Sequence, residues 1–356
     1  MKIIWTNNTN STISEGYGYA SHHIFNQLTQ YQDLNICDAN VQLDTELSMS
    51  PVNLGYAVSK KFDCDILINC SLPDAYNKCD GYNIGFSYWE TDQLPRDWVI
   101  EMNKMDEIWT TSQWAKNVFI NSGVTQPVFA FELGVDPKLY YPSHRGLSGS
   151  FSFLSIGSPS TRKNSQMVVD AFLSLFEGKE GYRLIYKSSG PPDARIGKGS
   201  GNMRSLYGHE QIEVIDDILS DEDLAKLYDR ANCLAYPTSG EGWGMIPFQA
   251  IMKGIPTICT KATACREYAD LSVPLKYSWS NRNLFGIYSG NGCWAAPNFT
   301  DLCDKMLYVV NNYNDVADFT YKNAMSVHER YSWESVTKDY YNRLCQILSN
   351  IKKRRS

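Results

Sequence analysis

The sequence predicts an α/β protein made of two Rossmann-like, doubly wound domains. Short apolar runs alternate with helical stretches, and the alternation starts again after a turn-rich interruption at residues 140–150. The length of 356 residues exceeds what a single hydrophobic core usually holds. Because parallel strands are joined by helical crossovers, each half is expected to form a parallel sheet with helices on both faces.

The first half, residues 1–145, is expected to contain buried strands at its short apolar runs, namely residues 2–6, 65–69, 83–88, 107–111 and 128–131. A loop with Gly16, Tyr17 and Gly18 follows the first strand, and a helix is expected from about residue 19. A strand, a glycine loop and a helix in this order can cradle a phosphate. Residues 113–121 are predicted to form a helix that ends at a Ser-Gly pair.

The second half, residues 146–330, repeats the pattern, with strands expected at residues 151–156, 182–187, 212–215, 233–236 and 256–260. Arg162 and Lys163 are expected to open a helix that runs to about residue 176. Another helix should begin near Met245, after a glycine-punctuated loop. The glycine-rich stretch 190–208 is predicted to be a surface loop, and residues 331–347 a last amphipathic helix.

Composition excludes several classes of function. The net charge of −6 argues against a nucleic-acid partner. The chain has ten cysteines and none forms a CxxC pair, which indicates free thiols in a reducing compartment, so a cytoplasmic location is expected. No apolar run approaches the roughly 20 residues of a transmembrane helix, so stable membrane insertion is not expected.

Charged residues fall on loops that follow the predicted strands. Arg162 and Lys163 follow one strand, Glu241 follows another, and Glu90 follows a strand of the first half. Ligands of doubly wound sheets bind beyond the carboxyl ends of the strands. Two or three cations together with a helix N-terminus suit a diphosphate, and Lys187, at the end of a strand, is a third candidate cation.

The segment RANCLAYPT followed by SGEGWGMIPFQAIMKGIP resembles the sugar-nucleotide motif of the family 4 retaining glycosyltransferases, which have the GT-B fold. Other matching segments occur in the same order, so that the resemblance covers nearly the whole chain: SEGYGYA, YWETDQLPRDW, EIWTTSQWAKNVFINSGV, LGVDPKLYYP, STRKNSQMVVDAF and YSWESV. The resemblance implies two domains facing each other across a cleft. It also implies that the last helix, within residues 331–356, packs back on the first domain.

The resemblance assigns roles to individual residues. Arg162 and Lys163 match the basic residues that hold the donor diphosphate, and Glu241 matches a glutamate that binds the donor sugar. Glu90 is the candidate at the place where many relatives have a catalytic histidine. The remaining donor-binding candidates are Gly16, Tyr17, Gly18, Lys187, Ile218, Leu219, Trp243, Gly244, Met245 and Gln249.

Gln249 is a departure from the family pattern, since relatives have a second glutamate at this position, where it holds the ribose hydroxyls. An amide can still accept one hydrogen bond and donate others. Ribose contact is therefore expected to survive in weakened form.

The resemblance implies a retaining, metal-independent transfer of a hexose from a nucleotide diphosphate sugar to an acceptor hydroxyl on a sugar, a glycan or another molecule. UDP-glucose is the first expected donor and a GDP-linked sugar the second. No metal and no cofactor besides the nucleotide sugar are expected. Asp63 and Asp65 have the Asp-x-Asp spacing of some metal sites, but they lie at the start of a strand, away from the carboxyl ends where ligands bind. Asp221 and Asp223 fit the first turn of a capped helix instead.

Two other readings stay open at this point. A GT-B enzyme of another class, such as a sugar-nucleotide epimerase or a phosphorylase, would share the donor site, although no convincing lysine for pyridoxal phosphate is visible. A non-catalytic sugar-nucleotide binder is suggested by Gln249 and would bind a donor without releasing nucleotide.

Overall fold

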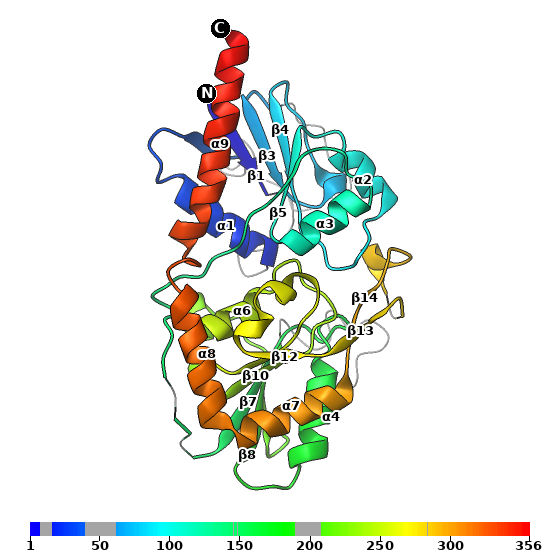
Figure 1. Ribbon diagram of the computed structural model, residues 1–356, viewed down its shortest axis with the longest axis vertical. Helices are drawn as coiled ribbons and strands as arrows, with labels where there is room; N and C mark the ends of the chain where they lie inside the picture. The colour runs from blue at the N-terminus through cyan, green and yellow to red at the C-terminus, as the bar shows by residue number, and fades with distance from the viewer. Residues whose placement is uncertain (8–15, 40–61, 145, 148, 189–207, 283) are drawn as a thin grey trace, which may run out of the picture. The chain divides into compact units, whose positions relative to one another are not determined.

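The computed structural model describes residues 1–7, 16–39, 62–144, 146–147, 149–188, 208–282 and 284–356. The chain divides into two compact units (Figure 1). Unit 1 consists of Met1–Trp89, Gln93–Gly134 and Trp333–Ser356, whereas unit 2 consists of Glu90–Asp92 and Val135–Ser332. The units therefore part at residue 134, before the turn-rich interruption at residues 140–150, and residues 90–92 are grouped with unit 2.

Unit 1 contains a parallel six-stranded sheet in the order β2-β1-β3-β4-β5-β6. The strands are β1 (Lys2–Thr6), β2 (Asn35–Asp38), β3 (Ile66–Cys70), β4 (Tyr82–Phe86), β5 (Glu107–Thr110) and β6 (Val128–Ala130). All residues of β3 and β5 are buried, as expected for parallel strands covered on both faces. The helical elements are α1 (Gly16–Leu28), the 3₁₀ turn η1 (Pro73–Ala75), α2 (Arg96–Met102), α3 (Gln113–Asn121) and α9 (Trp333–Arg355).

Helix α9 belongs to unit 1 and packs against α1, which crosses it at an angle (Figure 1). The Tyr340 hydroxyl donates to the Phe131 carbonyl at 3.1 Å. The Arg343 guanidinium contacts the fully buried Glu107 carboxylate at 2.5 Å. A buried carboxylate requires such a partner, so this ion pair ties α9 to the first residue of β5.

Unit 2 repeats the architecture with the strand order β12-β11-β10-β7-β8-β9, again all parallel. Its strands are β7 (Phe151–Ile156), β8 (Tyr182–Lys187), β9 (Ile212–Ile215), β10 (Cys233–Tyr236), β11 (Thr257–Thr260) and β12 (Val273–Leu275). Its helical elements are α4 (Ser165–Phe176), α5 (Asp221–Asp229), α6 (Met245–Met252), η3 (Thr263–Glu267), η4 (Ala269–Leu271), η5 (Gly286–Tyr288), α7 (Phe299–Asn311) and α8 (Tyr313–Val327).

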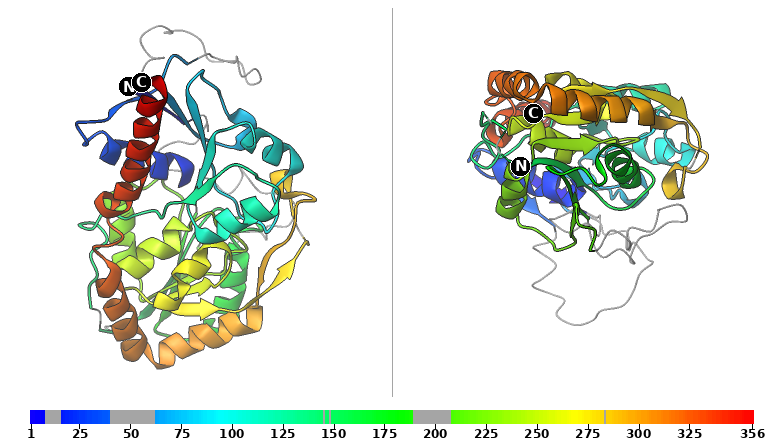
Figure 2. Two further views of the ribbon diagram at one scale, coloured as in Figure 1. Left: turned by 45° about the horizontal axis from the view of Figure 1, so that its top comes forward. Right: turned by 90° about the horizontal axis from the view of Figure 1, so that it is seen from below.

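The helices of unit 2 cover both faces of its sheet. Helix α4 packs with α7 on one face of the sheet (Figure 2). Side chains such as Phe153, Phe172 and Met306 belong to one hydrophobic core in this unit. Helix α6 packs against β10, β11 and α8. The predicted α/β class with two doubly wound halves is thus confirmed.

The structure corrects several predicted boundaries. Helix α1 begins at Gly16, so Gly16, Tyr17 and Gly18 lie in the first turn of the helix and not in a loop before it. Helix α4 begins at Ser165, which leaves Arg162 and Lys163 in the preceding loop. Residues 190–207 of the predicted surface loop lie outside the described residues.

A feature absent from the prediction is a two-stranded antiparallel hairpin, β13 (Tyr277–Ser280) and β14 (Trp294–Pro297). No helix in the described part of the chain combines the length and the apolar character needed to cross a membrane. All ten cysteines lie in the described ranges, and none is joined by a disulfide.

Candidate functional site

The strand order of unit 2 reverses between β7 and β10. Strands β8 and β9 follow β7 on one side, whereas β10, β11 and β12 continue on the other side. Ligands of open parallel sheets bind at such a switch point, beyond the carboxyl ends of the strands. The loop after β7 carries Arg162 and Lys163, and the loop after β10 carries Glu241.

The loop after β7 is fastened to the loop after β10 by Asn164. Its side-chain nitrogen donates to the Pro237 carbonyl and to the Ser239 hydroxyl, each at 2.8 Å. Asn164 adopts a left-handed conformation with φ 53°, which asparagine tolerates better than most residues. The backbone N–H of Ser239 also donates to the Arg162 carbonyl at 2.7 Å. The two loops therefore form one braced structure.

Glycines allow the close packing of the second loop. A Cβ atom on Gly240 would lie 2.3 Å from the Glu90 carbonyl oxygen. Glycine at this position therefore allows the backbone of residue 90 to pack against the loop. Gly244 precedes α6 with φ 88°, and a Cβ there would lie 2.5 Å from the Tyr268 hydroxyl. These two positions set the path of the loop that places Glu241.

The Glu241 carboxylate is buried at the centre of the site. Its Oε1 accepts hydrogen bonds from Lys163 Nζ at 2.7 Å, from the Thr238 hydroxyl at 2.7 Å and from the Tyr236 hydroxyl at 3.0 Å. The guanidinium of Arg162 lies 3.5 Å from its Oε2 and donates to the Gly240 carbonyl at 2.6 Å. The structure thus brings together the two predicted cations and the predicted carboxylate.

Electrostatic neighbours determine the protonation of this group. Burial alone would raise the pKa of Glu241, but the charges of Lys163 and Arg162 and the hydrogen bonds to the carboxylate outweigh burial and lower the pKa. Burial lowers the pKa of Lys163, and Glu241 opposes that shift. Glu241 is therefore ionised at neutral pH, and its negative charge is balanced by the adjacent cations.

Glu90, in the short segment Glu90–Asp92 that is grouped with unit 2, lies next to the same cluster. Its Oε2 accepts from the Tyr288 hydroxyl at 3.0 Å, and its Oε1 lies 4.0 Å from Arg162. Burial raises the pKa of Glu90; Arg162 opposes the shift, and the nearby Glu241 adds to it. The pKa of Glu90 is thus raised and the pKa of Glu241 is lowered. Such opposite shifts are common among groups that exchange protons in active sites.

The substitution Glu90→Gln is expected to stabilise the protein at neutral pH by an amount on the order of 1 kcal/mol. Because the pKa of Glu90 is higher in the folded protein, ionised Glu90 opposes folding. This cost is absent below the ordinary value of 4.5 and grows as the pH rises through the folded-state pKa. Glutamine carries no charge and still accepts from Tyr288.

Urea unfolding at several pH values from 4 to 8 would measure this difference. The stability gain of the variant over the wild type should be small in acid and should increase toward neutral pH. A gain that stays constant over the whole range would show that Glu90 keeps its ordinary pKa. The exposed Glu213, replaced by glutamine, is a suitable control.

Other predicted residues lie at neighbouring strand ends. Lys187 ends β8, next to β7, and its ammonium donates to the Ser188 carbonyl. Burial lowers the pKa of Lys187. Ile218 and Leu219 follow the edge strand β9, where the Ile218 side chain is 83% exposed. Strand β8 separates these two residues from β7.

The residues of α6 lie on the other side of the switch point. Met245 is the first residue of α6, and Gln249 is buried one turn further, where its Oε1 accepts from the Tyr228 hydroxyl at 3.3 Å. The Trp243 ring packs against Phe248, with ring centroids 5.2 Å apart. Backbone carbonyls of Trp243 and Gly244 both accept from Tyr268, so this part of the loop is held rigidly.

The glycine-rich start of α1 belongs to unit 1. The backbone N–H of Tyr88 donates to the Tyr17 hydroxyl at 2.8 Å, and the two rings stack with centroids 4.0 Å apart. Gly18 is buried, whereas Gly16 is exposed with open space around it.

Asp65, the second residue of the Asp-x-Asp pair, has protein partners. The Asp65 carboxylate accepts from the backbone N–H of Lys2 and from Arg355, each at 2.7 Å. Asp221 and Asp223 lie in the first turn of α5, where the Ser220 hydroxyl accepts from the Asp223 N–H. Within the described ranges, no group of three or more His, Cys, Asp or Glu side chains is arranged to hold a metal ion.

Sequence reasoning missed the partners that orient the charged groups, namely Thr238, Tyr236, Tyr288 and Asn164. Thr238 and Tyr236 stand within five residues of Glu241, so the spacing of polar residues at the end of β10 could have indicated them. Tyr288 is 198 residues from Glu90 along the chain and carried no such signal.

The arrangement can bind and stabilise a phosphate ester. Lys163 and Arg162 present fixed positive charge at the carboxyl end of β7, and the N-terminus of α6 faces the same switch point. Glu241 and its hydroxyl neighbours supply acceptors and donors suited to a polyol. A ligand that combines a diphosphate with a sugar matches both halves of this site.

Part of the sequence resembles known proteins. Residues 150–276 match the family model described as "Glycosyl transferases group 1". The serotype-specific mannosyltransferase WbdA of Escherichia coli is 25% identical over 213 residues, which cover 51% of this chain and 25% of that protein. The chain spans about a quarter of the length of the mannosyltransferases it matches.

Solved structures resemble the chain over nearly its whole length. Sucrose-phosphate synthase from Thermosynechococcus elongatus has a TM-score of 0.69 at 11% identity and covers 98% of this chain and 100% of its own. Anabaena Alr3699/HepE in complex with UDP has a TM-score of 0.66 at 12% identity, with coverage of 97% and 100%. These likenesses show a common fold.

Proposed function

We propose that the chain is a glycosyltransferase that transfers a hexose from a nucleotide diphosphate sugar to an acceptor hydroxyl. The match of residues 150–276 to a glycosyltransferase family model, the mannosyltransferase relative and the shared fold support this proposal. The observation that carries this proposal is the buried cluster of Lys163, Arg162 and Glu241 at the switch point of unit 2. Cations at this place stabilise the negative charge that develops on a departing diphosphate.

We further propose that the configuration of the sugar is retained. The bond between the anomeric carbon and the phosphate oxygen breaks, and the bond to the acceptor oxygen forms on the same face. The proton of the acceptor hydroxyl passes to the departing phosphate oxygen. Lys163 and Arg162 stabilise that oxygen, so the proposed reaction proceeds without a metal ion or another cofactor.

UDP-glucose is the first proposed donor, and a GDP-linked sugar is the second. The bound UDP of the Anabaena neighbour supports the first choice, and the mannosyltransferase relative supports a hexose. The proposed acceptor is a hydroxyl of a sugar, a glycan or another molecule. The free cysteines support a reducing, cytoplasmic location.

The decisive experiment is nucleotide release from a panel of UDP-, GDP- and ADP-sugars, with mixed sugar acceptors, read by mass spectrometry with and without EDTA. Release from one donor that continues in EDTA is the expected result. Donor binding without release would favour a non-catalytic binder. Isomerisation of the donor without an acceptor would identify an epimerase.

Gln249 is the observation that favours the non-catalytic binder, and the substitution Gln249→Glu tests it. A carboxylate forms hydrogen bonds with ribose hydroxyls that are about twice as strong as those of an amide. Donor affinity is therefore expected to rise several-fold, while the Tyr228 hydroxyl keeps an acceptor. Calorimetric titration with UDP would measure the change.

The substitution Gln249→Leu is the matched control, because it removes the acceptor while keeping a similar volume. Affinity should fall in this variant. If neither substitution changes the affinity for UDP, residue 249 does not contact the ribose, and its identity carries no information about catalysis.

A further inference from the structure

A short segment before β14 forms hydrogen bonds with residues 90–92. The Thr91 hydroxyl donates to the Asn291 carbonyl at 3.0 Å. The backbone N–H of Asp92 donates to the Cys293 carbonyl at 3.0 Å, and the Cys293 N–H donates back to the Asp92 carboxylate at 2.6 Å. These bonds join residues that are 200 and 201 positions apart in the chain, so they are tertiary contacts within unit 2 and not a local turn.

Tyr288 extends the same contact to Glu90. Its hydroxyl donates to Glu90 Oε2 at 3.0 Å. The Tyr288 side chain is 8% exposed, and its ring centroid lies 6.0 Å from those of Phe285 and Trp294. Because the ring is packed between other residues, its hydroxyl is presented to Glu90 from a fixed position.

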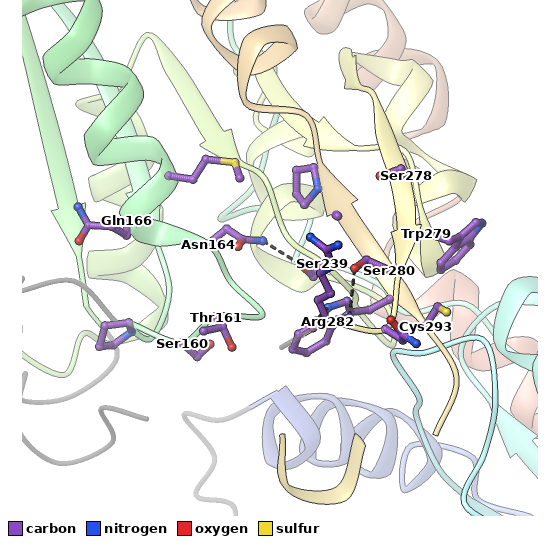
Figure 3. Close-up of a pocket in the computed structure, with 16 residues that line it drawn as sticks. Ser160, Thr161, Asn164, Gln166, Ser239, Ser278, Trp279, Ser280, Arg282 and Cys293 are labelled. Carbon is purple, nitrogen blue, oxygen red and sulfur yellow. Dashed lines mark hydrogen bonds between the residues drawn. The ribbon is translucent and has the colours of Figure 1, made fainter. Parts of the chain in front are cut away.

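The β13–β14 hairpin is in turn anchored on the loop after β10. The Ala295 N–H donates to the Ser239 carbonyl at 2.8 Å, and the Ser239 hydroxyl accepts a hydrogen bond from the loop after β7. Figure 3 shows Cys293 across a pocket of about 870 Å³ from Ser160 and Thr161. The hairpin and the loop after β7 thus form opposite walls of one pocket, and Ser239 is bonded to both.

Four neighbouring groups act on the protonation of Glu90. Burial raises the pKa of Glu90, the charge of Arg162 lowers it, and the charge of Glu241 raises it. The hydrogen bond from Tyr288 and the charge of Lys163 also lower this pKa. A hydroxyl that donates to a carboxylate favours the ionised form, so loss of the Tyr288 hydroxyl would raise the pKa of Glu90 further.

We propose that Tyr288 is a positioning residue for the transfer reaction, because its hydroxyl holds the Glu90 carboxyl in a fixed orientation beside Arg162. One oxygen of Glu90 is bonded to Tyr288 and the other lies 4.0 Å from Arg162. Without the first contact the carboxyl can rotate, and it then occupies the productive orientation less often. The inference rests on the proposed transferase function and adds a residue that lies outside residues 150–276, the part of the chain that matches the family model.

The substitution Tyr288→Phe removes the hydroxyl and keeps the ring. We expect kcat for sugar transfer to fall about tenfold, since the lost hydrogen bond is made to a charged group. The KM for the donor should not rise, because a carboxylate that repels the diphosphate is ionised less often when its pKa is higher. Initial rates over a range of donor concentrations would measure both constants, whereas general damage to the site would raise KM as well.

Two comparisons show whether Tyr288 acts through Glu90. In the Glu90→Gln background, Tyr288→Phe should change kcat less than about twofold, because the carboxylate is already absent. Tyr277→Phe is the matched control on the same hairpin, since the Tyr277 ring packs against Trp279 with centroids 5.4 Å apart, and it should keep both constants. Equal fold losses in the two backgrounds, or a rise in KM together with the fall in kcat, would overturn the assignment.

A measurement without substrate separates this failure from failure of the proposed function. Urea unfolding near neutral pH measures the stability gained by Glu90→Gln. This gain is expected to be larger in the Tyr288→Phe background than in the wild type, because loss of the hydroxyl raises the pKa of Glu90. Equal gains would overturn the role of Tyr288 even if nucleotide is released. A larger gain without release from any donor would keep the coupling of Tyr288 to Glu90 and overturn the transferase.

Discussion

Replacing Lys163 with methionine is expected to reduce the rate of sugar transfer about 10²–10³-fold at saturating donor. Methionine has a similar length but no charge, so it cannot stabilise the departing diphosphate. It also leaves the buried Glu241 carboxylate without its nearest cation, 2.7 Å away in the wild type. Removing one partner of a buried pair typically costs about 3–5 kcal/mol of stability.

Initial rates measured by mass spectrometry, with circular dichroism to check folding, would test this expectation. Lys261→Met is the control, since Lys261 pairs with Asp270 at a half-exposed position of the same unit and should keep the wild-type rate. A folded Lys163→Met variant that retained more than about a tenth of the rate would remove Lys163 from transition-state stabilisation.

The second large effect is expected for Gly244→Ala. Alanine is strained at φ 88°, and its Cβ would approach the Tyr268 hydroxyl to 2.5 Å and the Cys265 sulfur to 2.9 Å. We expect a stability loss of about 2–4 kcal/mol, together with loss of donor binding because the start of α6 is displaced.

A control glycine separates the two causes of this loss. Gly178 has a similar φ of 71° and open space around it, so Gly178→Ala carries the backbone strain without the collision. Guanidinium unfolding of both variants would report the two contributions. Equal losses would mean that the neighbours of Gly244 yield, and the loop would then be less rigid than the packing around Tyr268 indicates.

The sequence predicted most strands of the two sheets, because parallel strands are buried on both faces and therefore appear as continuous apolar runs. It missed β2, whose residues are exposed or partly buried, and the three-residue strand β12. Strands β7, β8, β9 and β10 have the predicted bounds. The charged residues of the site could also be predicted from the sequence, because the residues that follow such strands gather at one edge of the sheet. Arg162, Lys163 and Glu241 were found in this way.

Features that depend on tertiary packing could not be predicted from the sequence. The start of α4 was predicted too early because Asn164 takes a left-handed conformation that only its bonds to the next loop explain. The β13–β14 hairpin was missed because Trp279 is exposed and the segment has no extended apolar run. The contact of Tyr288 with Glu90 joins residues far apart in sequence, so no local pattern announces it.

The four ionisable groups of the site form a cluster with equal numbers of cationic and anionic side chains: Arg162 and Lys163 against Glu241 and Glu90. The opposite charges offset part of the free-energy cost of burying these groups together. If a nucleotide diphosphate binds here as proposed, its oxygens would replace the carboxylates as partners of the cations. Burial raises the pKa of Glu90, whereas the adjacent cations lower the pKa of Glu241, so Glu90 would be the easier of the two to protonate when a further negative charge enters the cluster.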